Sequence, residues 1–121
     1  MATNYVYEGK TVEYTNSSGS DISSGSPVVI GNLIGIALVD IPDTEAGTIA
    51  MEGVFTAPKV SGAVIAQGEP VIWDASASGF DDSLATPATG DVSGCCTAWE
   101  AAGNGVTEIA VKLNVGVGTV A

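Results

Sequence analysis

The chain has 121 residues, the size of one domain, and 45% of them are hydrophobic. Its 14 acidic residues face only three lysines, without arginine or histidine, and the net charge is -11. This balance argues against nucleic-acid binding and against an anionic membrane surface, because both require clustered Lys or Arg. We therefore expect a single domain over residues 1–121, with neither nucleic acid nor a membrane as a partner.

The N-terminal part predicts an arm followed by a strand and a loop. Residues 1–4 are expected to form a loose arm, without the basic and apolar pattern of a secretory signal, so we expect synthesis in a cytoplasm. Residues 5–14 alternate around Gly9, which predicts a strand with a bend. Residues 16–26 are rich in Ser and Gly and predict a polar loop.

The longest apolar stretch, residues 24–41, predicts the hairpin that organises the fold. Gly31 and Asn32 interrupt it, and Gly at the first central position suits a type II′ turn. We expect antiparallel strands over 27–30 and 33–40. Both faces of such a hairpin are apolar, so other elements must cover it.

The second half predicts further short strands and one helix. A strand over 47–55 should turn Ile49 and Met51 inward, with a bulge at Gly53. Residues 58–67 predict the helix, because Pro58 can begin it and Gly68 can end it. Further strands are expected over 70–74, 80–84, 92–100 and 106–115, followed by a C-terminal tail over 116–121. The predicted fold class is all-β, a single small barrel-like or sandwich-like domain of short antiparallel strands with one short helix.

The sequence offers little for catalysis. Without histidine there is no Ser-His-Asp or Cys-His pair. Gly9, Lys10 and Thr11 resemble the end of a phosphate-binding loop, but the first glycine of that motif is replaced by Asn4. The adjacent Cys95 and Cys96 are expected to be reduced thiols that point to opposite faces of a strand. We expect no enzyme activity and no cofactor.

Two weaker ligand hypotheses remain. Asp40, Asp43 and Glu45 lie on one predicted turn and could bind a hard cation, although carboxylates that cap their own turn are the ordinary explanation. Trp73 and Trp99 are expected in the core or in a subunit contact, with sugar stacking as the alternative.

Four segments, in this order and spacing, resemble a family of small capsid cement (head decoration) proteins of tailed phages. They are EGKTVEYT, EGVF-x-x-PK, AQGEPVIWD and VKLN, and the resemblance covers about residues 4–114. It implies an all-β subunit that binds the outside of an expanded icosahedral capsid, commonly as a trimer, without enzyme activity or cofactor. GCCTAW (94–99) and GVGTVA (116–121) depart from the family pattern.

The leading hypothesis is therefore a structural phage protein on the virion exterior, made in the bacterial host cytoplasm. It would bind the major capsid protein, reinforce capsomer junctions and form a homotrimer. The alternative is a phage-displayed β-sandwich that recognises a host surface glycan. Thr3, Asn4, Tyr5 and Tyr7 are the predicted capsid or subunit contacts, because Tyr combines a large ring with a hydroxyl. Tyr5 and Tyr7 could instead begin the first strand.

Overall fold

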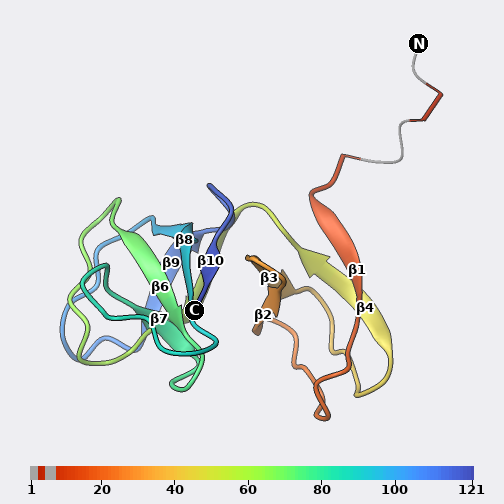
Figure 1. Cartoon of the computed structure of the whole chain (residues 1–121), viewed down its shortest axis with the longest axis horizontal. Coiled ribbons are helices and arrows are strands. Elements are labelled where there is room, and N and C mark those ends of the chain that lie inside the picture. The colour runs from red at the N-terminus through yellow and green to blue at the C-terminus, as the bar shows by residue number, and fades with distance from the viewer. Residues whose placement is uncertain (1–2, 5–7) are drawn as a thin grey trace.

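The structure is a computed structural model that describes residues 3–4 and 8–121, and these residues form two antiparallel sheets (Figure 1). The smaller sheet has four strands in the order β1-β4-β3-β2, and the larger has six, in the order β5-β9-β8-β6-β7 with β10 beside β8. The strands in the described residues are β1 Thr11–Thr15, β2 Pro27–Ile30, β3 Leu33–Ala37, β4 Ala46–Ala50, β5 Val54–Pro58, β6 Pro70–Asp74, β7 Gly79–Asp81, β8 Val92–Ala98, β9 Glu108–Lys112 and β10 Thr119–Val120.

The predicted central hairpin is confirmed. β2 pairs with β3 across a two-residue turn, with Ile30 opposite Leu33. Gly31 has a φ of 59°, the left-handed region that a type II′ turn demands of its first central residue. β3 ends at Ala37 rather than at residue 40, because the chain leaves the sheet there and Ile41 pairs with Ile22 instead.

The predicted strand over 47–55 is two strands in different sheets. β4 belongs to the small sheet, where it lies between β1 and β3, whereas β5 pairs with β9 in the large sheet. The chain crosses between the sheets at residues 51–53, where Gly53 has a φ of 111°. Alternation alone cannot reveal this crossing, because the residues on both sides of it remain extended.

The predicted helix over 58–67 is wrong, and the described residues contain no helix. Pro58 ends β5, Lys59 forms an isolated bridge with Phe80, and Ile65 forms another with Ala102. The Ile65 and Ala102 backbones exchange hydrogen bonds of 2.8 and 2.9 Å. Gly62 and the β-branched side chains of this segment weaken a helix, and these distant partners stabilise the extended chain instead.

The large sheet is strongly curved, but the described strands do not close a barrel. Its two outer strands, β5 and β7, meet at the single bridge between Lys59 and Phe80, where the Val60 N–H donates to the Phe80 carbonyl at 2.9 Å. A sandwich-like arrangement of two sheets therefore describes the molecule better than a barrel. The C-terminal tail, residues 116–121, contributes β10, which pairs with the start of β8.

The main core is built mostly from the large sheet and its connecting segments, and β3 of the small sheet adds to it. Ile34 and Ile36 of β3 join Trp73, Phe80 and Val111 of the large sheet in one buried cluster. The rings of Trp73 and Phe80 meet edge to face, with centroids 5.2 Å apart.

A second, smaller cluster lies on the other face of the small sheet. It contains Val28, Ala37, Ile41 and Ile49. Val28 belongs to this cluster whereas its neighbour Val29 packs against the main core, because successive residues of a strand point to opposite faces. Both faces of the hairpin are therefore covered, as the sequence predicts.

Candidate functional site

The predicted contact residues fall at the N-terminal end of the chain. Thr3 and Asn4 are exposed, and Tyr5 and Tyr7 lie outside the described residues. Just beyond them, Lys10 and Glu8 form an ion pair of 3.4 Å on the surface, which contributes little to stability. Thr11 opens β1 rather than a helix, so the Gly9-Lys10-Thr11 segment is not a phosphate-binding loop.

The two cysteines are free thiols, both buried in the main core. Their Sγ atoms lie 3.6 Å apart instead of pointing to opposite faces. The prediction of opposite faces is wrong because β8 bulges: Val92 pairs with Trp73 and Cys96 with Val71, and Gly94 has a φ of 89°. The hydrogen bond to Cys96 and burial raise the pKa of Cys95, so this thiol is a poor nucleophile at neutral pH.

Lys59 is the one lysine inside the molecule, with 5% of its surface exposed. Its Nζ donates to the carbonyl oxygens of Val60, Ser61 and Val106 at 2.8, 3.4 and 3.0 Å. The side chain thus ties the end of β5 to the loop before β9. All donors of the Nζ group have an acceptor. The lysine of the EGVF-x-x-PK segment therefore has a structural role.

The carboxylates of the acidic turn do not converge on a cation. Asp40 accepts a hydrogen bond from the Ser24 N–H at 2.8 Å, and Asp43 accepts one from the Gly19 N–H at 3.1 Å. Throughout residues 3–4 and 8–121, no group of three or more His, Cys, Asp or Glu is placed to hold a metal ion. Asp40 and Asp43 therefore hold the 16–26 loop, and the alternative that they cap their own turn is wrong, because their partners lie 16 and 24 residues away.

The two tryptophans have different surroundings. Trp73 is buried in the core, with 7% of its surface exposed, and cannot stack on a sugar. Trp99 is 46% exposed, and the Nζ of Lys112 lies 4.9 Å from its ring centroid in a cation–π contact. Val54 on β5 is also exposed and lies opposite Lys112. Trp99, Lys112 and Val54 together form one exposed area of the large sheet.

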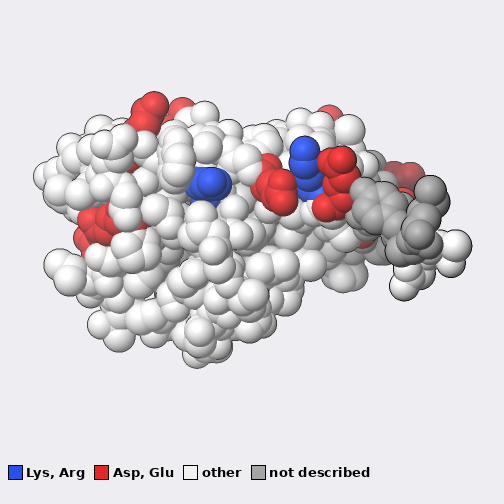
Figure 2. Space-filling view, turned by 90° about the horizontal axis from the view of Figure 1, so that it is seen from above, with Lys and Arg blue, Asp and Glu red and all other residues white. Residues whose placement is uncertain are grey.

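Charge is unevenly distributed on the surface. Figure 2 shows that the acidic and basic side chains of one side of the molecule lie in a band, and a broad area next to the band carries no charge. An uncharged area on a chain of net charge -11 can approach another protein without the repulsion that the acidic parts would cause.

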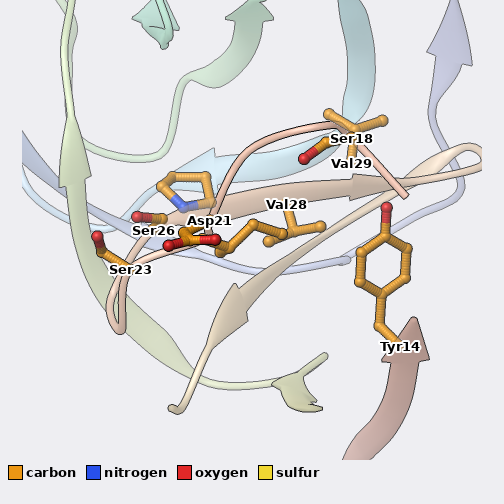
Figure 3. A pocket seen from close by; sticks show the side chains of 9 residues that line it. Tyr14, Ser18, Asp21, Ser23, Ser26, Val28 and Val29 are labelled. Atoms are coloured by element: carbon orange, nitrogen blue, oxygen red, sulfur yellow. The ribbon is translucent and has the colours of Figure 1, made fainter. Parts of the chain in front are cut away.

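A groove of about 380 Å³ lies beside β2, the edge strand of the small sheet (Figure 3). Tyr14 and Ser18 lie at one end of it, and Asp21 and Ser23 lie at the other, with Val28 between them. We call it the edge groove. Sequence reasoning missed it, because the loop over 16–26 gives no pattern from which its path can be predicted.

Asn16, which is fully buried, determines that path. Its Nδ2 donates to the Ser20 and Ile41 carbonyls at 2.7 and 2.9 Å, and its Oδ1 accepts the Ser18 N–H at 3.0 Å. One amide thus folds the loop back against the start of the acidic turn and sets one wall of the edge groove.

No helix in the described part of the chain is long and apolar enough to cross a membrane.

A family comparison covers most of the chain. No curated protein sequence matches the chain. A family profile described as phage cement protein matches residues 6–113, which include both sheets except β10. The chain therefore belongs to the phage cement protein family.

Proposed function

We propose that the protein binds the outer surface of the expanded phage capsid and reinforces the junctions between capsomers as a homotrimer. The major capsid protein is its partner, and the virion exterior is its location after synthesis in the host cytoplasm. The observation that carries this proposal is the match of residues 6–113 to the phage cement protein family. A cement protein acts by adding contacts across a junction, so it needs surfaces rather than a reactive site.

The chemistry of the described residues supports a structural role. The thiols are buried, Lys59 is bound by backbone carbonyls, and the carboxylates of the acidic turn hold loops. A net charge of -11 also suits the outside of a capsid better than its DNA-filled interior, because like charges repel.

Glycan recognition is the second candidate, and the exposed Trp99 is the observation in its favour. An aromatic platform stacks on a sugar through an open ring face, but Lys112 lies over the Trp99 ring. The Trp73 version of this hypothesis is wrong because that side chain is buried. Binding of the purified protein to host glycans, lost in Trp99→Ala, would favour this candidate.

Co-sedimentation with empty expanded capsids that lack this protein tests the proposal directly. We expect the protein to pellet with expanded capsids, and cryo-electron microscopy should show added density outside the shell at capsomer junctions. Unexpanded capsids serve as the control for the state that is recognised. Absence of binding to expanded capsids, or density on the inner surface, would contradict the proposal. Density without threefold symmetry would contradict the trimer.

A further inference from the structure

The outer edge of β2 carries backbone groups without a described partner. In a hairpin closed by a two-residue turn, Ile30 and Leu33 exchange hydrogen bonds, and the next bonded pair is Val28 with Gly35. The N–H and C=O of Val29 and the C=O of Pro27 therefore point away from β3. No described residue bonds to them. A row of free backbone groups on a strand edge is a template for another strand.

The edge groove follows this row. Both Val28 and Val29 line it, although their side chains point to opposite faces of the sheet, so the groove runs along the strand edge rather than over one face. Tyr14 and Ile22 add half-buried apolar surface. An extended segment in the groove would gain main-chain hydrogen bonds from the edge and apolar contacts from the walls.

The rim of the groove is acidic and has no counter-ion among the described residues. Asp21 is the acidic residue of the lining, and its carboxylate accepts the Asp43 N–H at 2.9 Å. Asp40 is outside the lining and accepts the N–H of Ser24, the neighbour of the lining residue Ser23. All three lysines are engaged elsewhere: Lys10 with Glu8, Lys59 in the core and Lys112 over Trp99.

The charge of the rim decides the kind of occupant. A second copy of this chain also carries a net charge of -11, so its approach to an acidic rim is unfavourable. A segment with Lys or Arg beside apolar residues is complementary to both the rim and the walls.

We propose that the edge groove binds an extended, basic and apolar segment of the capsid protein as an added strand beside β2. Alternate side chains of the segment would lie against Tyr14 and Ile22, and its cations would meet Asp21 in the lining, with Asp40 beside the groove. This inference rests on the proposed function, since it names the part of the cement protein that receives the capsid.

A peptide probe tests the groove without capsids. A synthetic peptide that alternates Lys and Val is added to the full chain, and a peptide that alternates Glu and Val is the control. We expect the Lys peptide to shift the amide resonances of residues 26–30 and to slow hydrogen exchange at Val29 about tenfold, because a free edge amide becomes bonded. The Glu peptide should do neither. If the Lys peptide leaves the resonances of β2 unchanged, the inference is wrong.

Charge variants with a matched control test the same groove on capsids. Asp21→Asn with Asp40→Asn removes the charge in the lining and the charge next to Ser24, but keeps an oxygen for the two backbone donors. Asp81→Asn with Asp82→Asn removes two charges that also accept backbone hydrogen bonds, at the end of β7 and in the turn after it. We expect only the first pair to weaken capsid binding, by about tenfold at low salt, with a smaller loss near 0.1 M.

A blocking variant tests the shape of the groove. Ser23→Trp fills it from an exposed position, whereas Ser17→Trp places the same side chain on the same loop outside the groove lining. We expect Ser23→Trp alone to abolish both the peptide response and capsid binding, at an unchanged melting temperature.

The outcomes separate the inference from the proposed function. If the wild-type protein fails to bind capsids, the proposed function is contradicted. The peptide response then still shows whether the edge groove binds an extended basic segment. Capsid binding that survives Ser23→Trp and both rim substitutions contradicts the groove but leaves the proposed function standing. If the protein forms concentration-dependent oligomers and Ser23→Trp prevents them, the groove binds a second copy of the chain. This result would overturn the inference.

Discussion

Asn114 joins the two sheets through a single side chain. Its Nδ2 donates to the carbonyl oxygens of Ile34 and Met51, both at 2.8 Å, and its Oδ1 accepts the Ile34 N–H at 3.1 Å. The Asn114 side-chain amide thus bonds to both backbone groups of Ile34, as a neighbouring strand would. β4 pairs with β3 only at Ile36 and Ala37, so Asn114 takes its place at Ile34. Asn114 also has a φ of 52°, a conformation that Asn tolerates better than most residues. This explains the last residue of the VKLN segment.

Asn114→Ala should destabilise the fold by about 3 kcal/mol, because partly buried backbone groups of Ile34 and Met51 lose their partners. Asn114→Gly removes the same hydrogen bonds but keeps the φ easy to adopt, so the difference between the two variants isolates the backbone cost. Asn32→Ala, which removes one 3.0 Å bond to Gly118, is the milder control. Urea unfolding measures all three. Equal stabilities of wild type and Asn114→Ala would show that this link between the sheets is dispensable.

Glu69 is a second residue that holds distant segments together. Its carboxylate accepts hydrogen bonds from the Ser83 N–H at 2.8 Å, the Ala66 N–H at 3.0 Å and the Ser83 hydroxyl at 2.9 Å. The backbone bond from Ser83, followed by that from Ala66, lowers the pKa of Glu69 below its ordinary value of 4.5. Together with Trp73 in the core, this accounts for much of the AQGEPVIWD segment.

The depressed pKa predicts a pH dependence with a definite sign. Folding favours the deprotonated Glu69, so its stabilisation is present above pH 4.5 and is lost as the pH falls through the lower pKa of the folded state. We expect Glu69→Gln to lose stability at pH 7 and to show a shallower decline on acidification. Glu100→Gln, which removes an exposed carboxylate, is the control. Thermal unfolding from pH 7 to 3 measures the slopes, and parallel curves for Glu69→Gln and wild type would contradict the assignment.

Among the elements, the crossing between β4 and β5 matters most, because it places consecutive strands in different sheets. Gly53 makes the crossing possible through its φ of 111°. A Cβ at this position would also lie 3.3 Å from Cε2 of Phe55, which packs against the main core. Both effects require glycine at residue 53.

Gly53→Ala is therefore expected to cost about 1–2 kcal/mol of stability, from the strained backbone and the close contact. Gly62→Ala is the matched control, because a Cβ at residue 62 would meet nothing within 4 Å and its φ is not in the left-handed region. Its stability should change by less than about 0.5 kcal/mol. A Gly53→Ala protein as stable as Gly62→Ala would refute this account of the crossing.

The N-terminal segment remains a predicted contact. Thr3 and Asn4 are exposed, and Tyr5 and Tyr7 lie outside the described residues. The first described strand is β1, which begins at Thr11, so deletion of residues 2–7 should change the melting temperature little. Capsid binding should fall at least about tenfold, or 1.4 kcal/mol. Unchanged capsid affinity would show that the segment is not a contact, and failure to fold would assign it to the core.

At the scale of the whole molecule, charge governs association. Each chain carries -11, and three chains together carry three times that charge. The repulsion opposes a free trimer, so if the proposed trimer forms on the capsid, we expect the capsid to supply contacts that offset it.

Added salt should therefore favour the trimer in solution, since the screening length falls to roughly 10 Å at 0.1 M. Sedimentation velocity at low and moderate salt measures the oligomer fraction. The Asp81→Asn and Asp82→Asn pair, which removes two charges, should associate more readily than wild type at low salt. An oligomer fraction that decreases as salt rises would exclude charge repulsion as the limit.

Local alternation, a Gly-Asn turn and a count of charges were enough to predict the all-β class, the central hairpin and the scarcity of basic residues, but not the absence of a helix. The family resemblance, now shown over residues 6–113, also came from the sequence alone. Features that depend on distant partners could be seen only in the folded chain. Ile65 stays extended because it pairs with Ala102, and the loop that walls the edge groove is folded by Asn16. Short apolar segments suit either a helix or a strand, and only the partners that they reach in space select one.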